Sequence, residues 1–279
     1  MRILIATTLL LACTTAFADN CRYTEPRNLD IDAGGIRLLA WEFGSDDLNL
    51  EGVAGLDRIE IRGRACGSSQ EALASVSLQQ ARDGDGVFVK VDKGDRKANW
   101  NGWFGSSYAY IDLEVRVPQR LMVSVTRGSG DVVIDKVAGI DSVAGSGDLK
   151  ANNISGPVVI KTGSGDARLR DVGPIKVRAL GSGNIEGDRV RGDVEVGSGG
   201  SGDLDFTDVT GNVSVDHVGS GDVTARNVSG NVHVGSIGSG DVRADDIGGD
   251  LVVESQGSGD TTHNDVKGRV DIPKRRDYR

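Results

Sequence analysis

A four-residue sequence, Gly-Ser-Gly-Asp, recurs through the C-terminal half of this 279-residue chain and limits what the chain can fold into. Its successive copies start 17 to 19 residues apart. The copies are Gly128–Asp131, Gly145–Asp148, Gly163–Asp166, Gly200–Asp203, Gly219–Asp222, Gly238–Asp241 and Gly257–Asp260, with Gly181–Asn184 as an eighth copy that ends in Asn. Repetition at so short a period indicates an architecture in which each unit packs on its neighbours.

The residues between these copies also repeat. An aliphatic β-branched residue follows nine positions after the first glycine of every copy: Val137, Ile154, Val172, Val190, Val209, Val228, Ile247 and Val266. Eleven positions after that glycine stands another glycine, except at Pro174. Alternating Val and Ile bounded by Gly, Ser and Asn predict short strands separated by tight turns.

One coil of about 19 residues cannot be stable alone, because the few aliphatic side chains it buries do not offset the entropy lost on ordering its backbone. Stacked coils share one core and hydrogen-bond to the coils above and below. Strands wound successively in one direction are parallel, and their crossovers are nearly always right-handed. The sequence therefore predicts an all-β fold, a right-handed single-stranded parallel β-helix (a solenoid). A left-handed helix of hexapeptide repeats would need an aliphatic residue every six positions, and that period is absent.

The last residue of each copy is the strongest candidate for a functional site. This column of carboxyl and amide groups comprises Asp131, Asp148, Asp166, Asn184, Asp203, Asp222, Asp241 and Asp260. Stacked carboxylates repel one another, so either calcium holds them, as in β-roll repeats, or each accepts a backbone N–H in its own turn while both glycines supply special dihedrals. The second, structural interpretation is preferred because Asn184 keeps the hydrogen bond without the charge. No metal site or cofactor is predicted.

Residues 1–18 have the features of an export signal, with Arg2, an apolar run and Ala16-Phe17-Ala18 before the cleavage point. An alternative is lipoprotein processing at Cys13. Cleavage after Ala18 leaves Cys21 and Cys66, for which an oxidising compartment predicts a disulfide.

The expected location is the periplasm or the cell surface, with no transmembrane segment. A net charge of −9 without a basic stripe argues against a nucleic-acid partner.

Residues 19–127 lack the repeat but alternate like strands, and we expect a β cap with irregular leading coils that continues into the solenoid at 128–272. Ser68 and Glu71 predict the start of a short helix. A basic tail occupies 273–279. One stretch is rich in aromatic side chains and is either a partner-binding loop or a cover for the solenoid end; it contains Trp100, Trp103, Phe104, Tyr108 and Tyr110.

The order of an export signal, weak strands, the segment Asp112–Pro118, a second strand and recurring Gly-Ser-Gly-Asp coils resembles the bacterial putative-adhesin domain family. The resemblance covers the whole mature chain. It implies an exported β-helix protein of undefined biochemical role and supplies no catalytic residues.

Enzyme signatures are absent from the sequence. The three histidines, His217, His233 and His263, occupy different positions in their repeats and are not expected to stack. The preferred function is a non-catalytic envelope or surface protein that binds an envelope glycan or a surface protein. A polysaccharide-degrading β-helix enzyme and a calcium-stabilised β-roll are the alternatives.

Overall fold

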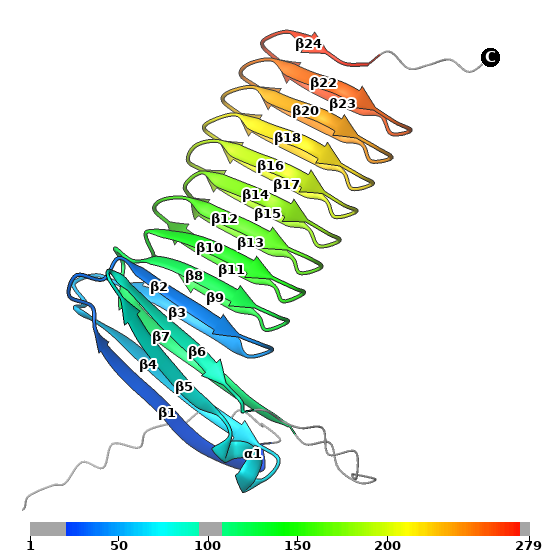
Figure 1. Cartoon of the computed structure of the whole chain (residues 1–279). Coiled ribbons are helices and arrows are strands. Elements are labelled where there is room, and N and C mark those ends of the chain that lie inside the picture. The colour runs from blue at the N-terminus through cyan, green and yellow to red at the C-terminus, as the bar shows by residue number, and fades with distance from the viewer. Residues whose placement is uncertain (1–20, 95–107, 274–279) are drawn as a thin grey trace, which may run out of the picture.

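The computed structural model describes residues 21–94 and 108–273 and contains two twelve-stranded sheets that face each other. Each Gly-Ser-Gly-Asp repeat contributes one strand to each sheet, and the coils stack into a solenoid with the only described helix, α1 (Gln70–Ala74), near one end and β24 at the other (Figure 1). The predicted β-solenoid of parallel coils is confirmed.

The first sheet, called sheet A, holds the strands that follow the Gly-Ser-Gly-Asp corners. Its strands in spatial order are β1 (Tyr23–Asp32), β4 (Arg58–Gly67), β7 (Ala109–Pro118), β3 (Asp47–Val53), β9 (Val132–Asp135), β11 (Leu149–Ile154), β13 (Ala167–Val172), β15 (Ile185–Val190), β17 (Leu204–Val209), β19 (Val223–Val228), β21 (Val242–Ile247) and β23 (Thr261–Val266).

The second sheet, sheet B, holds the other strand of each coil. Its strands in spatial order are β24 (Val270–Asp271), β22 (Leu251–Gln256), β20 (Val232–Ile237), β18 (Val213–Val218), β16 (Val194–Gly199), β14 (Ile175–Leu180), β12 (Val158–Thr162), β10 (Gly139–Ala144), β8 (Met122–Arg127), β2 (Leu38–Phe43), β6 (Gly86–Asp92) and β5 (Ser77–Asp83).

Inward-facing aliphatic side chains from both sheets form one continuous core. The residues nine positions into each repeat pair in register across neighbouring coils, with Val209 beside Val228 and Val228 beside Ile247. These three side chains are at most 1% exposed. The core also adjusts locally: Gly187 lies beside Phe206 in register, and the absence of a side chain at Gly187 leaves room for that buried ring.

The inward position of the ninth residue depends on a left-handed residue just before it. In every repeat the eighth residue has φ between 51° and 57°, and none of them is glycine: Lys136, Asn153, Asp171, Arg189, Asp208, Asn227, Asp246 and Asp265. Two consecutive outward residues precede the ninth, so strict alternation alone would turn it outward. The left-handed residue resets the direction, and Asn and Asp are favoured there because they tolerate this conformation.

The N-terminal part extends both sheets. Strands β2 and β3 form a coil that stacks in parallel on β8 and β9, and the chain between them and β8 builds the end of the molecule. Within that segment β6 and β7 add one more parallel strand to each sheet. The antiparallel strands β4 and β5, together with β1, which precedes β2 in the chain, complete the edges (Figure 1). The boundaries of the cap and of the signal and tail segments stay a prediction, and residues 1–20 and 274–279 lie outside the described part.

A disulfide and a short helix stabilise the cap locally. Cys21 and Cys66 form the predicted disulfide, with their Cα atoms 5.8 Å apart, and it joins the residues preceding β1 to β4. The short helix is present, but its N-cap is Ser69 and not Ser68; the Ser69 hydroxyl accepts the Ala72 N–H at 3.1 Å. Ser68 is used elsewhere, since its hydroxyl accepts the backbone N–H of Tyr108.

Candidate functional site

The Gly-Ser-Gly-Asp corners stack directly on one another, and this stacking explains their glycines. A Cβ at Gly147 would lie 2.0 Å from the carbonyl oxygen of Gly130, and one at Gly221 would lie 1.9 Å from that of Gly202. The expectation that these glycines supply special dihedrals is wrong, because none of the corner glycines has a positive φ. They are glycine because neighbouring coils approach too closely for any side chain.

The predicted column of Asp and Asn residues is a hydrogen-bonded ladder between coils. The Asp131 side chain accepts the backbone N–H of Asp148 at 2.9 Å, and the same bond repeats at every coil up to Asp260. The expectation that each side chain caps its own turn is therefore wrong, since the N–H belongs to the next coil. Asn184 takes part on both sides, receiving the Asp203 N–H and donating its own N–H to Asp166.

The ladder begins one coil earlier than the repeats suggest. Asp131 donates its N–H to the side chain of Asp47, which ends the degenerate copy Gly44-Ser45-Asp46-Asp47. Val53 and Gly55 stand nine and eleven positions after Gly44, so the repeat pattern was present but interrupted by the inserted cap. Asp46 replaces the second glycine, and its buried carboxylate accepts the Ile111 N–H at 2.9 Å and pairs with Lys93 at 2.7 Å, which ties this coil to the cap.

A second ladder runs along the turns that precede the strands of sheet B. Side-chain oxygens of Asp193, Asn212, Asn231 and Asp250 each accept the N–H of the equivalent residue in the next coil, at 2.7–2.9 Å, and Arg269 ends the series. In both ladders one side-chain oxygen of each residue has a fixed donor in the next coil, so the ladders link neighbouring coils.

One arginine is buried at the first corners. The Arg127 guanidinium donates to the carbonyl oxygens of Gly130 and Gly147 at 2.9 Å and to the Ser142 hydroxyl at 2.7 Å. Burial lowers the pKa of Arg127 to about 10, against the opposing effect of Asp131 and Asp148. It remains charged at neutral pH and joins three segments of the first coils.

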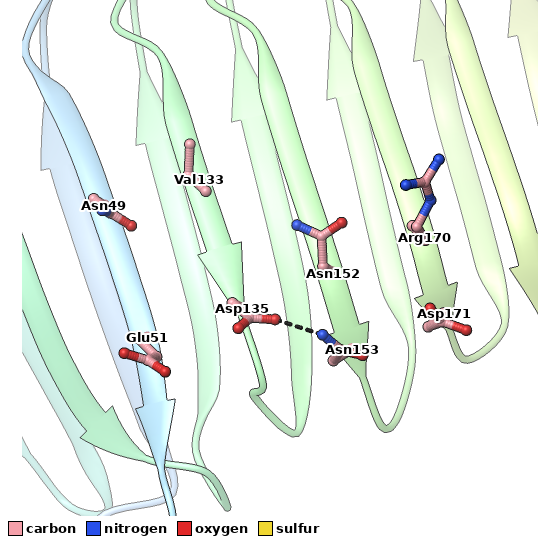
Figure 2. A pocket seen from close by; sticks show the side chains of 8 residues that line it. All are labelled: Asn49, Glu51, Val133, Asp135, Asn152, Asn153, Arg170 and Asp171. Carbon is pink, nitrogen blue, oxygen red and sulfur yellow. Dashed lines mark hydrogen bonds between the residues drawn. The ribbon is translucent and has the colours of Figure 1, made fainter.

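The outer face of sheet A carries a shallow groove near the N-terminal end (Figure 2). Its volume is about 460 Å³, and four strands contribute its lining: Asn49 and Glu51 from β3, Val133 and Asp135 from β9, Asn152 and Asn153 from β11, and Arg170 and Asp171 from β13. Parallel pairing places these side chains in rows across the strands, such as Glu51, Asp135, Asn152 and Arg170.

Along one margin of the groove the charged groups are held by bonds to one another. Lys136 pairs with Glu51 and Asp135 at 3.0 Å, and both carboxylates raise the pKa of Lys136. Asp135 also accepts a hydrogen bond from Asn153 at 2.8 Å (Figure 2). The Arg189 guanidinium holds the pKa of Asp171 below its usual value.

The middle of the groove combines free amides with an apolar floor. Val133 is 36% exposed, which is unusual for an aliphatic side chain in this protein. Asn49 lies beside it in register on β3, whereas Asn152 on β11 pairs with Asp135 (Figure 2). The side-chain amides of Asn49 and Asn152 form no hydrogen bond within the described ranges. Free amides beside an exposed aliphatic group suit a polar ligand that also presents C–H surface. Sequence reasoning missed these residues because outward positions carry no repeat signal.

The other predicted site residues are placed as follows. Trp100, Trp103 and Phe104 lie outside the described residues. Tyr108 and Tyr110 are half-buried at the start of β7, with ring centroids 6.2 Å apart. His217 contacts Ser236 and His233 contacts Glu254 on sheet B, whereas His263 lies on β23 of sheet A, so the histidines do not form one cluster.

The described part of the chain contains neither a metal-binding cluster nor a membrane-spanning helix. No group of three or more His, Cys, Asp or Glu side chains there is arranged to hold a metal ion. No helix between residues 21–94 or 108–273 has the length and apolar character needed to cross a membrane.

Comparison with solved structures places the fold among bacterial proteins of low sequence identity. A protein from Parabacteroides distasonis called a "putative lipid binding protein" superposes with a TM-score of 0.52 at 13% identity, over 90% of this chain and 98% of that one. A "putative adhesin" from Bacteroides fragilis gives a TM-score of 0.43 at 14% identity, over 90% and 98% of the two chains. A "putative cell adhesion protein" from Clostridium sporogenes gives 0.33 at 11% identity, over 90% and 99%.

Sequence comparison gives the family. Curated proteins provide no significant match. Residues 68–263, which include part of the cap and nearly all of the solenoid, match the family described as Toastrack DUF4097. The chain belongs to the Toastrack DUF4097 family.

Proposed function

We propose that this protein is a non-catalytic, exported component of the cell envelope or cell surface whose solenoid binds a polymer or a partner protein. The observation that carries the proposal is the groove on sheet A, whose lining includes the exposed Val133 and the side-chain amides of Asn49 and Asn152, which have no hydrogen-bond partner among the described residues. A rigid stack of coils offers long, regular surfaces, which suit extended ligands better than small substrates. Neither the groove nor the ladders bring a nucleophile beside a base.

Export is supported by the signal-like sequence of residues 1–18 and by the Cys21–Cys66 disulfide, which is typical of oxidising compartments. Intact-mass analysis of the exported protein tests this part. We expect a chain that begins at Asp19 and is lighter by two hydrogens than its reduced form. A lipid adduct on Cys13 would contradict cleavage after Ala18.

Binding can be tested with a panel of envelope glycans and whole cells, using wild type and an Asn49→Ala/Asn152→Ala variant. Thr262→Ala/Asn264→Ala is the matched control, because these residues occupy equivalent outward positions on β23, far along the same face. We expect the groove variant to lose at least tenfold in affinity, since two hydrogen-bonding groups are removed, and the control to bind normally.

The aromatic segment is a second place where the ligand could be held, and a Trp100→Ala/Trp103→Ala variant in the same screen addresses it. Wild-type binding that both double variants retain would refute both binding surfaces. Turnover of a glycan by the wild type would contradict the non-catalytic function and favour the polysaccharide-degrading alternative.

A further inference from the structure

A single column of outward-facing residues on sheet B changes charge along the length of the solenoid. Across β14, β16, β18, β20 and β22 the column contains Arg178, Gly197, Asp216, Gly235 and Glu254. Lys161 on β12 lies next to the start of the column, where it pairs with Ala179 and leaves Arg178 as the extra residue of a bulge. Two cations stand at one end and two anions at the other. The four charged side chains are all exposed.

The coils from residue 149 onward have the same polarity, although the first coil, residues 128–148, is acidic with one Lys against four Asp. Residues 149–191 contain eight Lys and Arg against four Asp and Glu, whereas residues 192–272 contain four Lys and Arg against fifteen Asp and Glu. Most cations of the first segment have an acidic neighbour, such as Arg178 with Asp141 at 3.0 Å. Lys161 and Asp216, however, have no ion-pair or hydrogen-bond partner for their side chains among the described residues, so both are available to another molecule.

The surface of this face has gaps beside its charged residues. The two glycines of the column leave gaps on either side of Asp216. A hollow of about 410 Å³ lies at the first gap, between the cationic and anionic parts, and is lined by Lys176, Val177, Arg178, Glu195, Val196, Gly197, Ser214 and Asp216. The neighbouring row of outward residues combines the small Ser198, Ser236 and Ser255 with the exposed His217.

We infer that this face of sheet B binds a second copy of the same chain in antiparallel orientation. A two-fold axis between β14 and β16 places Lys161 opposite the partner's Asp216, and by symmetry Asp216 opposite the partner's Lys161. Arg178 then faces the gap at the partner's Gly197. A partner with charge of one sign would be repelled by one end of the column, whereas an antiparallel copy is attracted at both ends.

The face is large enough for a specific dimer. Eight overlapping strands of about six residues cover roughly 38 Å by 20 Å, which is about 760 Å² on each copy, close to the roughly 800 Å² that each partner of a standard-size specific interface buries. Because the contacts are charged and exposed, association depends on ionic strength.

Sedimentation velocity on the full exported chain, at low and high ionic strength and over a range of concentrations, tests the inference. We expect wild type to dimerise at low ionic strength and to dissociate on addition of salt. Lys161→Asp and Asp216→Lys should each weaken the dimer at least tenfold, because each places like charges opposite one another twice. Residues 161 and 216 are both exposed on the outer face of sheet B, so each substitution exchanges one solvent-exposed charge for another.

A mixture of the two variants gives the decisive measurement. In the mixed dimer both contacts again join opposite charges, so we expect its affinity to return to within a few-fold of wild type. Lys150→Asp is the matched control, because it makes the same charge change on sheet A, and it should dimerise like wild type. A monomeric wild type at low ionic strength, or two variants that do not rescue each other while their thermal unfolding is unchanged, would overturn the inference.

Discussion

At Gly221 an added methyl group would lie 1.9 Å from the carbonyl oxygen of Gly202, although φ at Gly221 is not positive. Gly55 has the opposite environment, with φ of +73° and no atom within 4 Å of an added Cβ. We expect Gly221→Ala to lower the free energy of unfolding by about 3 kcal/mol, because the coils must move apart, and Gly55→Ala by only about 1 kcal/mol of backbone strain. Urea denaturation of both variants measures the difference, and equal losses would contradict it.

Arg127 stabilises the first corners through the hydrogen bonds of its buried guanidinium. Arg127→Ala removes the donors for two buried carbonyl oxygens and the Ser142 hydroxyl and leaves a cavity. We expect a loss of about 3 kcal/mol in unfolding free energy. Thr126→Ala, at the neighbouring exposed position of β8, is the control and should change the melting temperature little. Similar melting temperatures for both variants would show that the corner does not need its guanidinium.

The ladder along the corners acts as one element, and Asp222 is a test of it. Asp222→Asn keeps an oxygen that accepts the Asp241 N–H and removes one charge from a column of carboxylates, as Asn184 does naturally. We expect Asp222→Asn to equal or exceed wild type in stability at low salt, with the gain disappearing at high salt. Asp222→Ala should lose about 1 kcal/mol at any salt concentration. Calorimetric melting at two ionic strengths decides, and an Asn variant as unstable as the Ala variant would refute the ladder.

The sequence predicts those elements whose residues repeat for the same reason in every coil. Val209, Val228 and Ile247 recur because each fills the same core position, so their stacking followed from their spacing. Gly221 also recurs, but a recurring glycine can mean either that a side chain would clash with the next coil or that the backbone has a positive φ. The sequence alone does not distinguish these two causes. Asp47 was missed because Asp46 interrupts its copy to bind the cap. The groove around Val133 could not be predicted, since its residues come from four coils and share no repeated identity.

For the whole molecule, equivalence of the coils predicts that they can be removed as units. Deletion of residues 219–237 takes out one 19-residue coil and joins Val218 to Gly238, which has the same neighbours in the pattern as Gly219. We expect this variant to fold with a sheet-rich circular dichroism spectrum and a slightly lower melting temperature, because nearest-neighbour packing is restored. Deletion of residues 219–228 alone should prevent folding, since it leaves a strand of sheet B without its coil. Equal behaviour of the two deletions would contradict the equivalence.

The order of the first strands in the sequence affects the direction in which the solenoid can fold. Strands β2 and β3 are synthesised early, and β6 and β7, which flank them on the side away from the repeats, are complete by Pro118. A platform with two open parallel edges can therefore form before the first Gly-Ser-Gly-Asp copy is synthesised. Each later coil needs only the preceding coil as a template for its hydrogen bonds and its core contacts, so the solenoid can fold coil by coil from its N-terminal end.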